Sequence, residues 1–582
     1  MHTTDTQTHT SAHPPATAAH SGPQAVEEEG ISSYASSQTG VAPDMHSYTP
    51  FASENSKTST SPLDHREPDL GHHCGTITDN DDDKPSAAGA LPMDLEAAKQ
   101  QQDASKTDSV TSHNEKIRLV GWEGSDDPNH PHNWSVARRI YLTSLACVVV
   151  LASTFTSSIS SGVSKSLMEH YGFGEEVAAL TISIFVAGYI LGPWLWGPLS
   201  ERIGRRKVFS ASLLIYTCWN VGCALAPNTG ALLAFRLLAG TAAAAPLSNS
   251  GGLIADLWKT RVRGIATGLY ACAPFTGPAL GPIVSGFIQD SGVNFRWAFW
   301  VCAIFSGVCW SLVVLTLPET YAPVLLKHKA QHLRRETGSD LYRAPLEQHA
   351  KLTPSTLVRT VLIKPFIMSV QEPMLLASIL FMAFLYGVVY LLFEAVPIVF
   401  GQGYGFSAGI VGLMFIPFAV GAFGGVLFYI AVLFPRYARM IDRAPDSQVA
   451  PEERLPMAML GAPVLTIGFF WFAWTSDPNI NFWAPMLSTA LLGFGIFFVF
   501  QGLFNFIIDA YTVNAASALA AGVIVRSCFG AAFPLFARQM YSRLGTKWGS
   551  SLLGFLALAM TPIPFLLHRY GARLRAMSRN AK

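Results

Sequence analysis

The stretch "GPLSERIGRRKVF", from Gly197 to Phe209, places one acid, four bases and two glycines between two long apolar runs. Such charges can bind lipid phosphates, pair with one another or contact the charged end of a helix dipole. Two further ionisable residues, Arg236 and Glu394, lie inside apolar runs. An ionisable group in an apolar environment needs a partner, water or a bound ion. These residues predict charge pairing and the binding of protons or ligands.

Residue types with the spacing for covalent or metal chemistry are missing. The sequence has no catalytic triad, metal-ligand cluster or phosphate loop, so we expect no enzyme activity, metal or other cofactor. Seven of the eight cysteines fall inside apolar runs without CxxC spacing. We expect them to behave as small buried hydrophobes rather than as a disulfide framework.

Charge divides the chain into two unlike segments. Residues 1–133 hold 7 Lys/Arg and 21 Asp/Glu and are rich in Ser, Thr, His and Pro, whereas residues 134–582 hold 33 Lys/Arg and 18 Asp/Glu. The first segment cannot bury enough apolar surface to fold, so it predicts a disordered tail over 1–133. It also lacks the basic and apolar regions of a cleavable signal peptide.

The second segment predicts an all-α polytopic membrane protein, because a helix needs about 20 apolar residues to cross a bilayer. A six-helix bundle over 134–318, a central loop over 319–373, a second six-helix bundle over 374–568 and a tail over 569–582 follow from the spacing of the apolar runs. The twelve expected spans are approximately 139–161, 176–198, 208–227, 231–256, 264–288, 297–317, 374–397, 408–434, 456–475, 482–506, 515–536 and 548–568.

The basic residues predict the orientation of these spans. With a cytoplasmic N-terminus, 26 Lys/Arg from residue 134 onward fall on cytoplasmic segments and 5 on external ones. Loops enriched in Lys and Arg face the cytoplasm. Both termini are therefore expected in the cytoplasm, in a multi-pass protein of the plasma membrane, with the vacuolar membrane as the alternative.

The spans and the loop motif together resemble the major facilitator superfamily. The loop between the second and third spans follows the family pattern G-x-L-a-D-r-x-G-r-k, with Glu201 at the Asp position. Topology alone does not explain the acid and both glycines, so we infer that this loop is a latch that holds the two bundles together on the cytoplasmic side in the outward-open state. Plain enrichment of basic residues in a cytoplasmic loop is the alternative. The candidate gating residues are Gly197, Glu201, Arg202, Gly204, Arg205 and Arg206.

A second motif in the fifth span narrows the resemblance to exporters. The stretch "GLYACAPFTGPALGPIVSG" matches the antiporter pattern G-x8-G-x3-G-P-x2-G-G, except that Ser285 replaces one glycine. The stretches "DDPNHPHNWS", "LPETYAP" and "NAASALAAG" resemble those of fungal twelve-span drug:proton antiporters. Helix bending and close helix contact are the expected roles, with packing alone as the alternative. The motif residues are Gly268, Gly277, Gly281, Pro282 and Gly286.

Charged residues in the spans are candidates for coupling. By resemblance, Arg236 matches an arginine linked to proton coupling; a structural cation bound to backbone carbonyls is the alternative. Glu394 could take up a proton or bind a cationic substrate, or could face the membrane interface. Asp256 is expected to form a structural pair with Lys259, Arg261 or Arg263. Asp509 and Arg526 are expected to stabilise the second bundle.

By resemblance, the first, fourth, seventh and tenth spans line a central cavity. Asn249 in the fourth span and Gln501 and Asn505 in the tenth are therefore candidate coupling or substrate-binding residues. Phenylalanines with a few amides suit an amphipathic organic compound. The expected function is proton-coupled export of a drug, toxin or secondary metabolite by alternating access, with polyamines or organic acids as alternative substrates. Sugar import and a non-transporting sensor are further alternatives. The expected partners are a small-molecule substrate, protons and membrane lipid, and we expect no nucleic acid. The protein is expected to be a monomer.

Overall fold

The computed structural model describes residues 118–124, 126–348, 364–443, 449–512, 515–578 and 581, and the predicted tail up to residue 117 lies outside them. In the described residues, ten helical segments are long and apolar enough to cross a membrane. One of them, Ser517–Met577, holds two spans, because Gly545 with φ 72° breaks the helix there. A further helix, α5, begins with three basic residues and is not among the ten. This arrangement is consistent with the twelve predicted spans.

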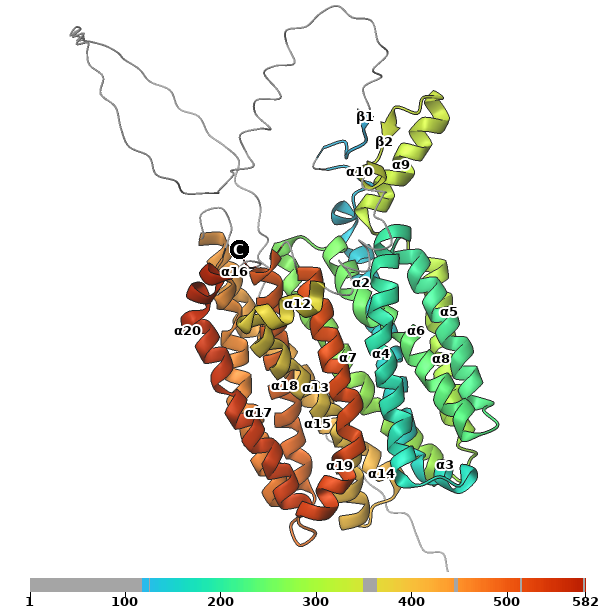
Figure 1. Ribbon diagram of the computed structural model, residues 1–582, viewed down its shortest axis with the longest axis vertical. Coiled ribbons are helices and arrows are strands. Elements are labelled where there is room, and N and C mark those ends of the chain that lie inside the picture. Colours follow the sequence, from blue (N-terminus) through green and yellow to red (C-terminus); the bar gives the residue numbers. More distant parts are fainter. Residues whose placement is uncertain are drawn as a thin grey trace, which may run out of the picture. The chain divides into compact units, whose positions relative to one another are not determined.

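Six long helices and one short helix form the first half of the molecule (Figure 1). Pairs of these helices pack tightly, and α2 contacts α7, α4 contacts α6, and α5 contacts α8. Their bounds are α2 Val136–Gly162, α3 Ser164–Tyr171, α4 Glu175–Ile203, α5 Arg205–Ala224, α6 Thr229–Leu257, α7 Thr260–Asp290 and α8 Arg296–Thr316.

The second half repeats this architecture with more interruptions. π-helical segments extend α13 and α15, and α19 and α20 together make the last two spans. The bounds are α13 Pro373–Val396, η4 Pro397–Gly403, α14 Ala408–Leu413, α15 Ile416–Phe428, η5 Tyr429–Leu433, α16 Phe434–Arg443, α17 Pro456–Thr475, α18 Trp483–Ala510, α19 Ala515–Met560 and α20 Pro562–Met577.

Glycines let the helices within each half approach closely. A Cβ at Gly240 of α6 would lie 2.0 Å from the Phe185 carbonyl oxygen of α4. A Cβ at Gly493 of α18 would likewise lie 2.0 Å from the Phe418 carbonyl oxygen of α15. Such contacts hold helices together where the surrounding solvent is itself apolar.

Large apolar side chains cover the outside of the helices. Leu315, Leu427 and Val420 are 78%, 67% and 60% exposed, and many other apolar side chains join them. Contiguous exposed apolar surface of this extent fits a lipid environment rather than water. The buried side includes many hydroxyls, and Thr154, Thr156 and Ser158 of α2 are all buried.

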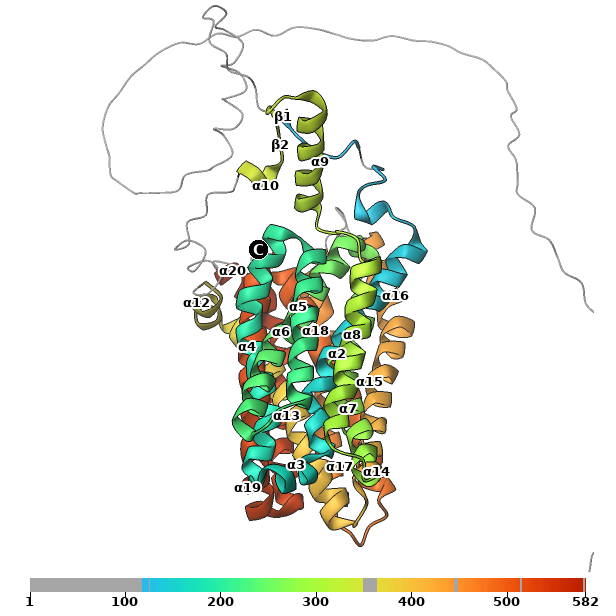
Figure 2. The same ribbon diagram turned by 90° about the vertical axis from the view of Figure 1, so that its right-hand side faces the viewer.

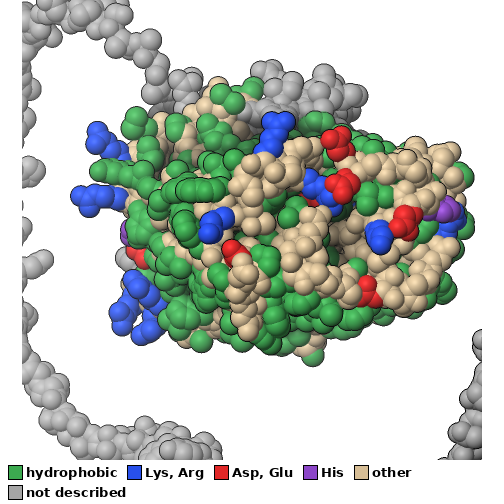
Figure 3. All heavy atoms as spheres, turned by 90° about the horizontal axis from the view of Figure 1, so that it is seen from below, with side chains coloured by type: hydrophobic (Ala, Val, Ile, Leu, Met, Phe, Trp, Pro, Cys, Tyr) green, Lys and Arg blue, Asp and Glu red, His purple; other side chains and the backbone are tan. Residues whose placement is uncertain are grey.

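The two ends of the bundle differ, and they are named here by their short helices. The α9 end carries α9 (Ala322–Thr337), α10 (Pro345–Gln348), α12 (Lys364–Gln371) and the turn from α4 to α5 (Figure 2). The α3 end carries α3 and α14. Figure 3 views the α3 end, where apolar and uncharged groups dominate and a few acidic and basic side chains lie side by side.

Order at the α9 end extends further than the sequence predicts. Residues of the predicted tail form β1 (Arg118–Leu119) and the 3-10 helix η2 (Pro131–Asn133), and β1 pairs in parallel with β2 (Tyr342–Arg343) of the central loop. The central loop also contains α9, which buries Ala330 against Val120. These few apolar contacts order segments that the sequence predicts to be a tail and a loop. The composition of those segments does not reveal the contacts.

Asp127 fixes this segment. Its carboxylate accepts the backbone N–H groups of Glu123 at 3.1 Å and Asn129 at 2.9 Å, and lies 3.7 Å from Lys329 of α9. These hydrogen bonds lower the pKa of Asp127. The stretch "DDPNHPHNWS" therefore connects the first described residues to the central loop through the contacts of Asp127.

Candidate functional site

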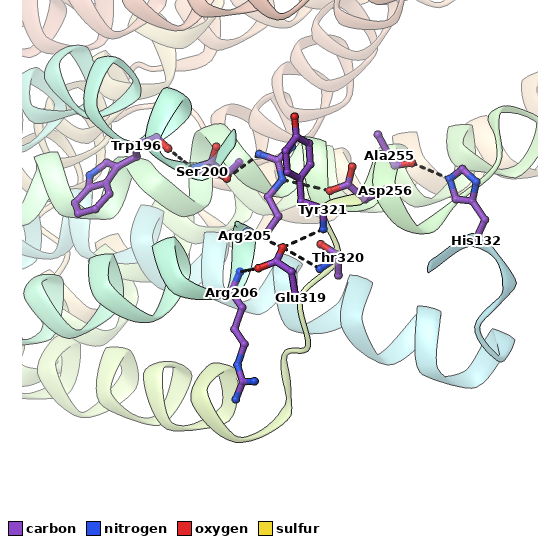
Figure 4. Close-up of polar contacts among 11 residues, drawn as sticks. His132, Trp196, Ser200, Arg205, Arg206, Ala255, Asp256, Glu319, Thr320 and Tyr321 are labelled. Carbon is purple, nitrogen blue, oxygen red and sulfur yellow. Dashed lines mark hydrogen bonds and ion pairs between the residues drawn. The ribbon is translucent and has the colours of Figure 1, made fainter. Parts of the chain in front are cut away.

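Gly204 and Glu319 close the turn from α4 to α5, and Figure 4 shows Glu319 beside Arg205 and Arg206. Gly204 has φ 99°, and a Cβ there would lie 2.1 Å from Oε2 of Glu319. The Glu319 carboxylate, just after α8, accepts the backbone N–H groups of Arg205 at 2.9 Å and Arg206 at 3.3 Å. Because these groups carry the positive end of the α5 dipole, Glu319 caps that helix. Only glycine fits this turn without strain.

Arg205 connects the turn to α6. Its Nε donates to Asp256 at 3.2 Å, and its Nη1 donates to Ser200 at 2.8 Å. Its guanidinium lies 4.9 Å from the centre of the Tyr321 ring (Figure 4). Burial raises the pKa of Tyr321, so this hydroxyl stays protonated. Asp256 is therefore paired, but the predicted partner was wrong: the base is Arg205, the first residue of α5, and not Lys259, Arg261 or Arg263.

The other loop residues face away from this network. A Cβ at Gly197 would meet nothing within 4 Å, so the predicted close helix approach does not occur there. Arg206 donates to the Val314 carbonyl of α8 at 3.0 Å. Glu201 and Arg202 are exposed, and among the described residues Glu201 has no hydrogen bond or ion pair. The proposed link from Glu201 to the second half is therefore absent in this conformation.

The glycines of α7 pack against α2. A Cβ at Gly277 would lie 2.1 Å from Thr154 Oγ1, and a Cβ at Gly281 would lie 2.1 Å from Ser158 Oγ. Pro282 has no N–H to donate to the carbonyl of Pro278 one turn earlier. Ser158 donates to that carbonyl at 2.8 Å instead. The motif therefore combines close packing with replacement of the hydrogen bonds that its prolines remove.

The end of α7 also contacts the second half. A Cβ at Gly286 would lie 2.3 Å from the Ala408 carbonyl oxygen of α14. Asp290 accepts the backbone N–H groups of Ala408 at 3.1 Å and Gly409 at 2.8 Å. Asp290 is thus the N-terminal cap of a helix in the other half. A Cβ at Gly268, at the other end of the motif, would lie 3.2 Å from the Tyr429 ring.

A charged cluster joins the halves at the α3 end. Arg538 of α19 donates to Glu394 of α13 at 3.1 Å and also pairs with Glu175 at the start of α4. Next to it, Gln539 donates to Glu176 at 3.2 Å. Glu394 is 8% exposed and therefore depends on Arg538 for its charge balance.

Arg236 is fully buried, and backbone carbonyls occupy its donors. It donates to the carbonyl oxygens of Thr181 at 3.0 Å, Thr156 at 2.8 Å and Ser157 at 2.9 Å. Its guanidinium also lies 4.4 Å from the centre of the Phe185 ring. This is the structural cation named above as the alternative to a coupling role.

The three candidate amides differ in their surroundings. Asn249 donates to the Trp196 carbonyl at 3.4 Å and so links α6 to α4. Both amide atoms of Gln501, and Nδ2 of Asn505, are buried without a hydrogen-bond partner. Gln501 and Asn505 therefore keep free hydrogen-bonding capacity inside the second half.

Sequence reasoning missed three residues that organise the two ends: Glu319, Asp290 and Arg538. Glu319 lies in the stretch "LPETYAP", which gave a resemblance but no role. Asp290 ends the antiporter span, and Arg538 was counted only as an external base. Each of the three contacts a partner more than 100 residues away in the chain. The spacing of residues along the sequence does not reveal such contacts.

The family model of the Major Facilitator Superfamily matches residues 145–535, so the chain belongs to this superfamily and is a multi-pass membrane protein. The chain is 41% identical over 445 residues to "Efflux pump FUB11" of Gibberella moniliformis, covering 76% of this chain and 74% of that protein. It is 42% identical over 461 residues to "MFS-type efflux pump MFS2" of Trichophyton rubrum, covering 78% and 76%.

A solved structure confirms the fold alone. The crystal structure of the human organic anion transporter MFSD10 matches with a TM-score of 0.54 at 17% sequence identity. The match covers 74% of this chain and 100% of that one. At this identity the likeness carries no information about what this chain binds.

Proposed function

We propose that this protein is a proton-coupled exporter of small amphipathic organic compounds, such as drugs, toxins or secondary metabolites. The observation that carries the proposal is that Arg538 and Asp290 bridge the halves at the α3 end, while Glu201 at the α9 end forms no hydrogen bond or ion pair among the described residues. This is the geometry of one state of an alternating-access cycle. The fungal relatives named efflux pumps support the direction of transport.

The distribution of basic residues supports an orientation with the α9 end in the cytoplasm, because 26 of the Lys/Arg from residue 134 onward belong to that side and 5 to the other. The conformation then faces inward, ready to load substrate from the cytoplasm. We place the protein in the plasma membrane as a monomer with both termini inside.

Protons would act at the external cluster. An external proton taken up by Glu394 removes the charge that holds Arg538 between Glu394 and Glu175. The bridge between α19 and α4 weakens, and the external side opens to release the substrate. After the α3 end opens, Glu201 approaches the second half and forms the cytoplasmic latch expected from the loop motif.

Flux measurements in vesicles test the proposal. The protein is reconstituted with an imposed pH gradient, and loss of fluorescent or toxic amphipathic compounds from the loaded side is followed. We expect uphill transport that stops when a protonophore collapses the gradient, and Glu394→Gln should uncouple transport from pH. Transport that ignores the gradient contradicts proton coupling, and the absence of any flux favours a sensor.

A further inference from the structure

Arg526 of α19 is a buried cation of the second half. Among the described residues, no acidic side chain balances its charge. Its side chain is 7% exposed, and its Nε has no hydrogen-bond partner. No ion pair joins it to an acidic side chain in the described part of the chain. Two aromatic rings flank the guanidinium, with centres 5.3 Å away for Tyr386 and 5.4 Å away for Phe500.

Other buried arginines in the described residues are satisfied. Arg205 pairs with Asp256, Arg454 donates to Asp509 at 2.8 Å, and Arg236 donates to three backbone carbonyls. Arg526 was predicted to stabilise the second half. Only its two contacts with aromatic rings support that prediction. Ring contacts stabilise a guanidinium from its faces, whereas its N–H donors lie in its plane and stay available for an oxyanion.

A small pocket lies beside this cation. Its walls are apolar apart from Arg526, and they come from α13, α18 and α19, which are neighbours in Figure 1. A Cβ at Gly522 would only reach ordinary contact with Ile379 and Met382, at 3.7 and 3.9 Å, so the pocket has room at that point. The lining residues are Met382, Phe504, Ile507, Ala518, Leu519, Gly522, Val523 and Arg526.

The neighbours of the pocket fit an amphipathic guest. Ala518, Gly522 and Arg526 follow one another at intervals of four, so they share one face of α19. Gln501 and Asn505, with unpartnered amide atoms, belong to α18, the helix that supplies Phe500 and Phe504. Phe500 in turn meets Phe275 of the first half, with ring centres 5.2 Å apart.

We propose that Arg526 binds the carboxylate of an amphipathic organic acid, whose apolar body packs against neighbouring apolar side chains such as Met382 and Phe504. The proposal rests on the exporter function above and narrows its substrate class. A guanidinium forms two parallel hydrogen bonds to a carboxylate, and a buried site strengthens them. The same charge repels a polyamine or another organic cation, which disfavours that alternative.

Matched compounds on wild-type and variant protein test the site. The probes are phenyl-, naphthyl- and octyl-substituted propionic acids with their corresponding alcohols and amines, so that each body carries an anionic, a neutral and a cationic head. Binding to the purified full-length protein is measured by thermal stabilisation, and export by vesicle flux. The variants are Arg526→Gln and Arg526→Lys, and the control is Arg543→Gln, an exposed arginine of the same helix.

We expect the wild-type protein and the control to bind the acids better than the alcohols and amines. Arg526→Gln should weaken acid binding about tenfold or more and leave alcohol binding unchanged, and Arg526→Lys should restore part of the loss. Equal acid binding in Arg526→Gln and wild type, or a wild-type preference for amines or alcohols across the panel, overturns the site. Binding that depends on Arg526 without any flux overturns the exporter function instead and leaves the site intact.

Discussion

Gly204 and Gly197 belong to the same loop motif, but a methyl group would meet different surroundings at each. At Gly204 the backbone is left-handed and the Glu319 carboxylate fills the space, whereas at Gly197 the space is open. We predict that Gly204→Ala destabilises the protein by about 1–2 kcal/mol and lowers transport. Gly197→Ala serves as the matched control and should change neither. Thermal unfolding in detergent measures both, and equal effects of the two substitutions contradict the account of this turn.

Substitution of Glu201 tests the proposed latch, which belongs to the outward-open state. Glu201 is exposed here and should be needed only when the α9 end closes. Glu201→Gln is expected to reduce transport severalfold at unchanged surface expression and unchanged melting temperature. Glu319→Gln, which weakens the cap on α5, should lower both transport and melting temperature. Normal transport by the Glu201 variant would show that the loop's acid has no gating role.

At the scale of elements, the contact of α2 with α7 depends on matched residues on the two helices. A Cβ at Gly281 would collide with Ser158 Oγ, which itself donates to the Pro278 carbonyl. Gly281→Ala should therefore destabilise the protein. In that background Ser158→Ala should cost less than it does alone, with a coupling energy of at least about 0.5 kcal/mol. Strictly additive melting shifts would argue against direct contact of these residues.

The spans could be predicted from the sequence because a run of about 20 apolar residues has few other solutions. The short elements could not, since the small cluster that holds them together contains only Val120, Ala330 and Ala344 as buried residues. The motif glycines were predicted as a group, yet only the structure separates Gly204, where a Cβ would collide with Glu319, from Gly197, where it would meet nothing. Arg236 and Arg526 look equivalent in sequence, and only their partners distinguish them.

At the scale of the whole molecule, the two halves and their order follow from the spacing of the spans, but the state of the molecule does not. It depends on pairs between the halves, such as Arg538 with Glu175 and Gln539 with Glu176, which are far apart in the chain. Arg538→Gln removes the bridge among three elements. We predict that this variant populates the externally open state even without protons and transports with a weakened dependence on external pH, measured in the same vesicles.

The distance between the halves at each end tests alternating access most directly. In a cysteine-free background, spin labels at the exposed residues Glu169 and Ser542 report on the α3 end, and labels at Ile203 and Ser517 report on the α9 end. On acidification, which neutralises Glu394, we predict a longer distance for the first pair and a shorter one for the second. Distances that stay constant, or that change in the same direction at both ends, would contradict the account.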